Sequence, residues 1–337
     1  MLRIHFTDGD LARVHLAREP DPVWETLLSL NQLTAPRRGL PVFAHWRRTA
    51  RAKLAEERLA GPVRMLAALA PASAGYWPDF MTPDASADGM EAALEELHAT
   101  PRPRLRRELD RLAETHPLPP WAHGLARGDR TTTEEVATAF RLVHRTIVTP
   151  DWAGTARTTE ADRALRTRIL RDCGVHGLLD SFRPLMVWRP PVLHVRYPED
   201  RDLHLHGRGV RLIPSHFCWH MPIALADPAL PQVLAYPVAH PPAGAPAVTR
   251  DRRPEALATL IGRTRARVLA ALDATATTGE LARRLGISAP SASEHVAALR
   301  EVDLAHSRRV GSQVIHTLTP LGSALLSGDL PPHRPST

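Results

Sequence analysis

Histidine and cysteine side chains spaced two residues apart form the first set that could carry chemistry. They lie in the segments LHLH and SHFCWH, at His204, His206, His216, Cys218 and His220. In a β-strand, side chains two residues apart point to the same face, so each segment would present its side chains together. Imidazole and thiolate are preferred zinc ligands. With His194, this pattern supports one hypothesis: a metal-dependent enzyme or a metal sensor.

A simpler explanation competes with the zinc hypothesis. The chain has 18 histidines, so close pairs arise by chance, and histidine pairs on strands are often surface or core residues. The sequence has no G-x-S-x-G elbow, phosphate-binding loop, dinucleotide fingerprint or H-E-x-x-H motif. We therefore predict no metal, no cofactor and no enzyme activity, and keep the metal site as the alternative.

Arginine and small polar side chains near the carboxyl end form the second set. The arginines are Arg283, Arg284, Arg300, Arg308 and Arg309. A guanidinium group pairs well with a phosphate. Ser291 and His295 lie among these arginines and could reach base edges in a DNA groove. This chemistry suits a nucleic acid and needs no catalytic residue.

A helix and a tight turn are predicted to hold the first arginines. Thr277 or Thr278 can cap the helix, with Glu280 in its first turn. Leu281 and Leu285 are four residues apart and share a face. Gly286 can adopt the positive φ that ends a helix and permits a sharp turn.

A second helix is predicted to follow the turn at once. Ser288 is a good N-cap, and Pro290 is tolerated in a first helical turn. The apolar residues that recur at helical spacing are Ala292, Val296 and Leu299. This stripe leaves the small and polar residues outside, namely Ala289, Ser291, Glu294 and His295.

A short β-hairpin is predicted after the second helix. HSRRV and QVIHTL flank Gly311 and Ser312, a pair suited to a turn, and Arg308 and Arg309 precede the tip. A helix at 263–273 precedes these elements and a short helix at 321–326 follows them. This order is that of a winged helix-turn-helix, whose second helix enters the DNA major groove while the wing contacts the backbone.

The segment 255–325 resembles the winged-helix domain of ArsR-type bacterial regulators. The run LGIS…S.SEH…LRE.DL..SRR.G..V…LTPLG carries the resemblance. It implies that the recognition helix meets DNA through Ser288, Ser291, Ser293 and His295, and the wing through Arg308, Arg309 and Gln313. The N-terminal part of the chain also resembles actinobacterial ArsR-like regulators with a long N-terminal region of unknown function. This resemblance is carried by the segments LRIHFTDGDLARVHLA, PDPVWETLLSL and GVRLIPSHFCW.

The segment departs from the ArsR pattern in two ways. Ala289 and Pro290 replace polar residues often found at the start of the recognition helix, which weakens base readout there. The thiol pair of metal-sensing members is missing, because GELARRL contains no cysteine. The resemblance therefore implies no metal sensing at that position.

The rest of the chain changes its pattern near residue 191. Strand 2–6 comes first, residues 20–182 are mostly helical in pattern, and prolines mark the joins. From 191 the apolar residues alternate, which predicts strands that strand 2–6 would join. The fold class is thus α+β: a mostly helical N-terminal domain with a small antiparallel sheet, then a C-terminal winged helix-turn-helix domain.

Four regions are predicted. They are an N-terminal domain (1–245) for dimerisation or effector binding, a Pro-rich linker (246–254), the winged helix (255–327) and a disordered tail (328–337). The aromatic residues of the first region either line a ligand cavity or, as we favour, anchor the core. These are Trp24, Trp46, Trp77, Trp121, Trp152, Trp188, Trp219, Tyr76, Tyr197 and Tyr236.

Composition limits the partners. The net charge of +7 suits a polyanion, but Lys53 is the only lysine, and a GC-rich genome would favour arginine codons without functional cause. Two cysteines do not make a disulfide framework, and neither an apolar leader nor a run of 18 apolar residues occurs. We expect a cytoplasmic protein that does not bind membranes.

The function predicted from these patterns is transcription regulation. The protein would bind double-stranded DNA as a homodimer, because two-fold symmetry lets two recognition helices read two half-sites. A small-molecule effector would act through the N-terminal domain. A protein-interaction module is a third hypothesis, since winged helices also bind proteins.

Overall fold

The computed structural model describes residues 1–34, 41–72, 75–219, 221–240, 253–272, 276–310 and 313–327. The chain divides into two units, Met1–Ala243 and Gly244–Thr337. Of the predicted linker 246–254, only the last two residues are described, and they begin a helix. The predicted tail 328–337 lies outside the described residues.

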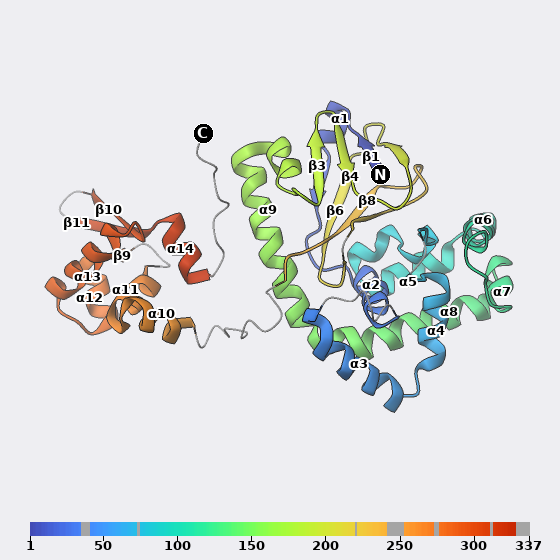
Figure 1. Cartoon of the computed structure of the whole chain (residues 1–337), viewed down its shortest axis with the longest axis horizontal. Coiled ribbons are helices and arrows are strands. Elements are labelled where there is room, and N and C mark those ends of the chain that lie inside the picture. Colours follow the sequence, from blue (N-terminus) through green and yellow to red (C-terminus); the bar gives the residue numbers. More distant parts are fainter. Residues whose placement is uncertain are drawn as a thin grey trace. The chain divides into compact units, whose positions relative to one another are not determined.

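Two mixed four-stranded sheets form one part of the first unit (Figure 1). One sheet has the order β3 (Met186–Arg189), β4 (Val192–Val195), β1 (Leu2–His5) and β5 (Arg201–His204). The other has the order β2 (Val14–Leu16), β6 (Val210–Ser215), β8 (Val233–Pro237) and β7 (Ile223–Ala224). β1 runs antiparallel to β4 but parallel to β5. In the second sheet, β2, β6 and β8 run parallel and β7 antiparallel.

The fold class is confirmed, but the sheets are two and mixed, where the sequence predicts one antiparallel sheet. Segment 11–17 does not pair with strand 2–6, because the short helix α1 (Asp8–Leu11) separates β1 from β2. Thr7 and Asp10 close a capping box on α1, and Asp10 Oδ1 accepts a hydrogen bond from Gly209 N at 2.9 Å. This contact holds the chain where β2 meets β6. Strand 2–6 joins the later strands, as predicted.

Helices make up the rest of the first unit (Figure 1). They are α2 (Pro22–Thr34), α3 (Ala44–Glu56), α4 (Ala60–Leu69), α5 (Met90–Ala99), α6 (Arg102–Ala113), α7 (Ala122–Ala126), α8 (Arg130–Val143) and α9 (Trp152–Asp180). α9 contacts β2, β3 and β6. Gly174 interrupts it with a φ of 68° and ψ of −173°, where the sequence allows either one helix or two broken near this glycine.

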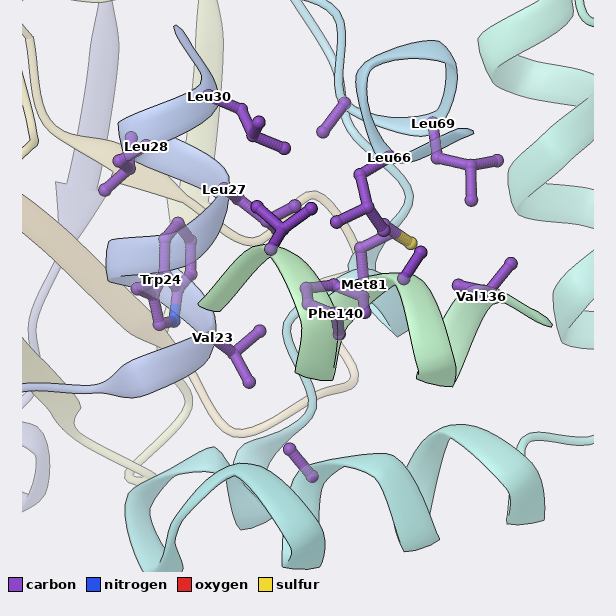
Figure 2. Close-up of a cluster of buried hydrophobic side chains, with 14 of the residues drawn as sticks. Val23, Trp24, Leu27, Leu28, Leu30, Leu66, Leu69, Met81, Val136 and Phe140 are labelled. Carbon is purple, nitrogen blue, oxygen red and sulfur yellow. The ribbon is translucent and has the colours of Figure 1, made fainter. Parts of the chain in front are cut away.

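The helical core forms around α2 (Figure 2). Leu27 is fully buried and points from α2 towards Met81 and Phe140, whereas Leu28 points to the other side of the helix. Burial of each such side chain contributes about 1.5–3 kcal/mol. A second cluster, which includes Leu2, Ile4 and Leu212, lies on the sheets. Both faces of α2 are thus enclosed.

A buried carboxylate on α2 fixes the loop after β6. Glu25 accepts hydrogen bonds from His216 N (2.7 Å), Phe217 N (3.0 Å) and Ser215 Oγ (3.1 Å). Burial raises the pKa of Glu25 to about 7, because the loss of water disfavours the charged form more than these three donors favour it.

The pKa of Glu25 predicts how stability depends on pH. The free energy of unfolding should fall as the pH rises from the ordinary pKa of 4.5 to about 7, since the folded state holds the proton more tightly. Glu25→Gln imitates the neutral form and should flatten this part of the profile. Urea unfolding of both proteins at about pH 5 and about pH 8 measures the difference. Parallel profiles would contradict the assignment.

The second unit contains helices and one antiparallel sheet. The helices are α10 (Arg253–Ile261), α11 (Arg263–Ala271), α12 (Thr278–Leu285), α13 (Ala289–Glu301) and α14 (Pro320–Ser327). The strands lie in the order β10 (Ala305–Val310), β11 (Gln313–Leu318) and β9 (Ala276–Thr277). A separate cluster that includes Val268, Leu281 and Leu299 forms the core. Among the described helices of both units, none is long and apolar enough to cross a bilayer.

Candidate nucleic-acid interface

α12 begins with the capping box that the sequence predicts. Thr277 Oγ accepts from Glu280 N, and Glu280 Oε2 accepts from Thr277 N at 2.8 Å. The hydrogen bond from Thr277 N and a second one from Thr277 Oγ to Glu280 Oε2 (3.0 Å) lower the pKa of Glu280, the backbone one most. Arg283 and Arg284 lie in the last turn of α12 and are exposed. The cap fixes the first residue of α12, and therefore the positions of Arg283 and Arg284 on the surface of the helix.

The turn after α12 has the left-handed residue that the sequence predicts. Gly286 adopts φ 67° and ψ 36°. Ile287 N then donates to Ala282 O at 3.1 Å, and the Ile287 side chain packs against the core. Arg267 of α11 donates to Leu285 O at 2.9 Å, which satisfies a carbonyl at the end of α12. The turn is therefore tied to both helices.

α13 starts at the predicted cap and packs on the predicted stripe. Ser288 Oγ accepts from Ser291 N at 3.2 Å, and Pro290 lies in the first turn. The Ser288 hydroxyl thus caps α13, a role additional to the DNA contact that the resemblance implies. Ala292, Val296 and Leu299 are at most 2% exposed, so these three fix which face of α13 turns outwards.

The outward face of α13 centres on residues other than the predicted base readers. Ser293 is exposed, whereas Ser291 and His295 are half-buried, at the flank of the helix. At 3.6 residues per turn, the face opposite the core carries Pro290, Glu294 and Ala297, which are all exposed. The sequence predicts that Glu294 lies on the outer face of this helix but does not predict a contact between Glu294 and DNA. Its carboxylate is suited to accept from a cytosine amino group.

The wing is a paired hairpin with arginines on its first strand. Arg308 lies opposite Ile315 and Arg309 opposite Val314, and both arginines are exposed. The predicted turn at Gly311 and Ser312 lies outside the described residues, as does the Gln313 side chain. The hairpin holds two cations on one short stretch of rigid backbone.

A buried histidine joins the wing to the start of α12. His316 is 5% exposed, its Nδ1 lies 2.7 Å from Ser307 Oγ, and its Nε2 lies 2.8 Å from Thr278 Oγ. Burial lowers its pKa, which favours the neutral ring. The alternation of residues 314–318 predicts that Val314, His316 and Leu318 all face inwards; His316 and Leu318 do, whereas Val314 is 39% exposed. The two hydroxyl partners become evident only in the tertiary structure.

Comparison with protein families agrees with this geometry. Residues 260–308 match the family model described as a helix-turn-helix domain. This stretch contains α11, α12, α13 and part of the wing. Residues 260–308 therefore form a helix-turn-helix domain. The searches of curated proteins and of solved structures gave no match. The helix-turn-helix domain is ArsR-like and indicates DNA as a partner.

Exposed arginines surround α13 in the helix-turn-helix domain and its wing. Arg283 and Arg284 precede α13, Arg300 lies in its last turn, and Arg308 and Arg309 follow on β10. Positive side chains at both ends of a helix can bind phosphates on either side of a groove. The arrangement suits a helix that enters a major groove.

The histidine-rich segments lack the strand geometry that the zinc hypothesis needs. β5 ends at His204, and His206 lies beyond it with a φ of 54°, so the two do not share a strand face. His216 and Cys218 follow the end of β6, and Cys218 is fully buried with Sγ 3.4 Å from Met221 O. His220 lies outside the described residues. Among those described, no three His, Cys, Asp or Glu side chains are grouped to hold a metal ion.

Proposed function

We propose that this protein is a transcription regulator of the ArsR type that binds double-stranded DNA as a homodimer. The observation that carries the proposal is the helix-turn-helix domain with exposed arginines before, within and after its second helix. Two such domains related by two-fold symmetry would read two half-sites about one helical turn apart.

Each group of polar residues has its own part in the proposed mechanism. Arg283, Arg284, Arg308 and Arg309 neutralise phosphates and supply affinity that depends on salt. The outward side of α13 reads base edges: Glu294 supplies an acceptor at its centre, with Ser293 on one flank and Ser291 and His295 on the other. Ser288 caps α13, and so sets the angle at which this face meets the groove.

Genome-wide mapping of bound DNA tests this function. The full chain should enrich discrete sites with two-fold symmetry, and a chain that ends at residue 252 should enrich none. Ser291→Ala with His295→Ala should change the preferred sequence, because each lost base contact alters discrimination by about 1–3 kcal/mol. Binding to unrelated DNA should stay the same, since these residues do not neutralise phosphates.

Two controls make the mapping experiment decisive. Circular dichroism verifies that the variants keep their helices, and sedimentation of the full chain measures the mass of the assembly. Failure of the folded full chain to enrich any site, together with a stable protein partner in pull-downs, would overturn the proposal in favour of a protein-interaction module.

A further inference from the structure

A cavity of about 210 Å³ lies inside the unit Met1–Ala243. Its walls come mainly from α2 and from residues 75–82, 197–201, 217–219 and 221–226. Its aromatic lining consists of Trp24, Tyr76, Trp77, Tyr197, Phe217 and Trp219. At a packing density of about 0.75, this volume holds about 160 Å³ of ligand atoms. That is the size of a bicyclic aromatic molecule with a small substituent.

Three α2 residues that line this cavity carry a buried polar atom without a partner among the described residues: Trp24 Nε1, Asn31 Oδ1 and Gln32 Oε1. Trp24 and Gln32 are each 1% exposed, yet Trp24 Nε1 and Gln32 Oε1 make no hydrogen bond there. Gln32 Nε2 donates to Phe217 O at 3.1 Å, which fixes the amide and leaves its oxygen to the cavity. Such atoms cost about 1–3 kcal/mol each when unpaired, so a ligand that pairs them gains affinity.

The charged groups of the cavity wall are already engaged. Asp79 accepts from Ala226 N (2.9 Å) and Asp227 N (2.7 Å). Arg201 donates to the carbonyls of Leu225 and Ala226. Arg111 stacks on the Tyr76 ring at 4.1 Å and lies 3.9 Å from Glu199, which is half-buried. The wall thus offers aromatic faces and mostly neutral donors and acceptors; Arg201 Nε is a further donor that has no partner among the described residues.

We infer that this cavity binds a neutral, flat, bicyclic aromatic molecule that carries both a hydrogen-bond acceptor and a donor. The acceptor pairs with Trp24 Nε1, and the donor pairs with Gln32 Oε1, two turns further along the same face of α2. The aromatic side chains enclose the ring system. This binding belongs to the first unit alone, so it does not depend on the proposed DNA binding.

Indole-3-carboxamide is a suitable probe, because it has the required size, an acceptor and donors, and no charge. Calorimetry and ligand-observed NMR with the full chain should detect its binding. Indole-3-carboxylate has the same shape but a negative charge, and it should bind at least about tenfold more weakly, because burying an unpaired charge is costly.

Two matched tryptophan variants locate the bound probe. Trp24→Phe keeps a ring but removes the N–H, and it should weaken carboxamide binding about tenfold. The variant should also melt at a lower temperature, because the smaller ring leaves a void at a side chain that is 1% exposed, so binding is measured at a temperature where both variants are folded. Trp46→Phe is the control: Trp46 Nε1 donates to Ile147 O at 3.0 Å and does not line the cavity. This variant should melt at a lower temperature and bind the probe like the wild type.

The outcomes separate a ligand site from ordinary core packing. Weaker binding in Trp24→Phe alone supports the inference. No binding of the carboxamide by the wild type, equal binding of the carboxylate, or equal loss in both tryptophan variants would overturn it. None of these results bears on whether the second unit binds DNA, so the two proposals fail separately.

Discussion

Replacing Arg308 and Arg309 together with alanine should weaken DNA binding about 60-fold at about 0.1 M salt for each wing. Both side chains are exposed on β10, where pairing with β11 holds the backbone in register. Each phosphate contact releases a counterion and contributes about 0.9 to the slope of log K against log salt. Loss of two contacts should therefore reduce that slope by about 1.8 for each bound wing, or about 3.6 for the proposed homodimer, and affect all DNA sequences equally.

Fluorescence anisotropy with labelled duplexes across a range of salt concentrations measures both quantities. Arg48→Ala with Arg168→Ala is the matched control, because these arginines are also exposed but lie in the first unit. The control removes the same net charge and should leave the salt slope unchanged. Equal slopes for the wing variant and the wild type would show that β10 does not contact phosphates.

Leu299→Ala should lower the melting temperature of the helix-turn-helix domain while leaving the stability of the first unit unchanged. Leu299 is 1% exposed in the small core of the second unit, and truncation of a buried leucine costs about 2–5 kcal/mol. A domain of this size has a total stability of only about 5–10 kcal/mol, so the loss takes away much of it. DNA binding should be lost at temperatures where the first unit remains native.

The distribution of tryptophan makes this prediction easy to measure. All seven tryptophans lie in Met1–Ala243, so their fluorescence reports that unit alone, while circular dichroism reports helices of both. In Leu299→Ala, part of the dichroism signal should melt early and the fluorescence transition should stay in place. Val302→Ala, at a site 58% exposed, should change neither. A fluorescence transition that shifts with Leu299→Ala would show that the two units unfold together.

Separate cores also explain how one chain could join two activities. Side chains around α2 and the sheets enclose the proposed ligand cavity, and Val268, Leu281 and Leu299 hold the proposed DNA-reading surface. Because no core residue is shared, substitutions in one unit should leave the intrinsic binding of the other intact. Variants such as Trp24→Phe and the wing double variant can therefore be combined in one protein.

The sequence by itself determined the local features of the helix-turn-helix domain. The Thr277 cap, the left-handed Gly286 and the Ser288 cap follow from interactions within about four residues, which a linear pattern contains. The stripe Ala292, Val296 and Leu299 likewise fixed the buried face of α13, because the period of a helix is constant.

Only the tertiary structure decided which distant segments meet. Alternation marked the strands but could not show that β1 lies between β4 and β5, because any strand offers the same backbone donors and acceptors. The same holds for Glu25, whose three donors lie about 190 residues away, and for His316, whose hydroxyl partners lie on two other elements. The histidine segments failed as strand pairs for this reason: alternation of residue type does not fix where a strand ends, whereas hydrogen bonding to neighbouring strands does.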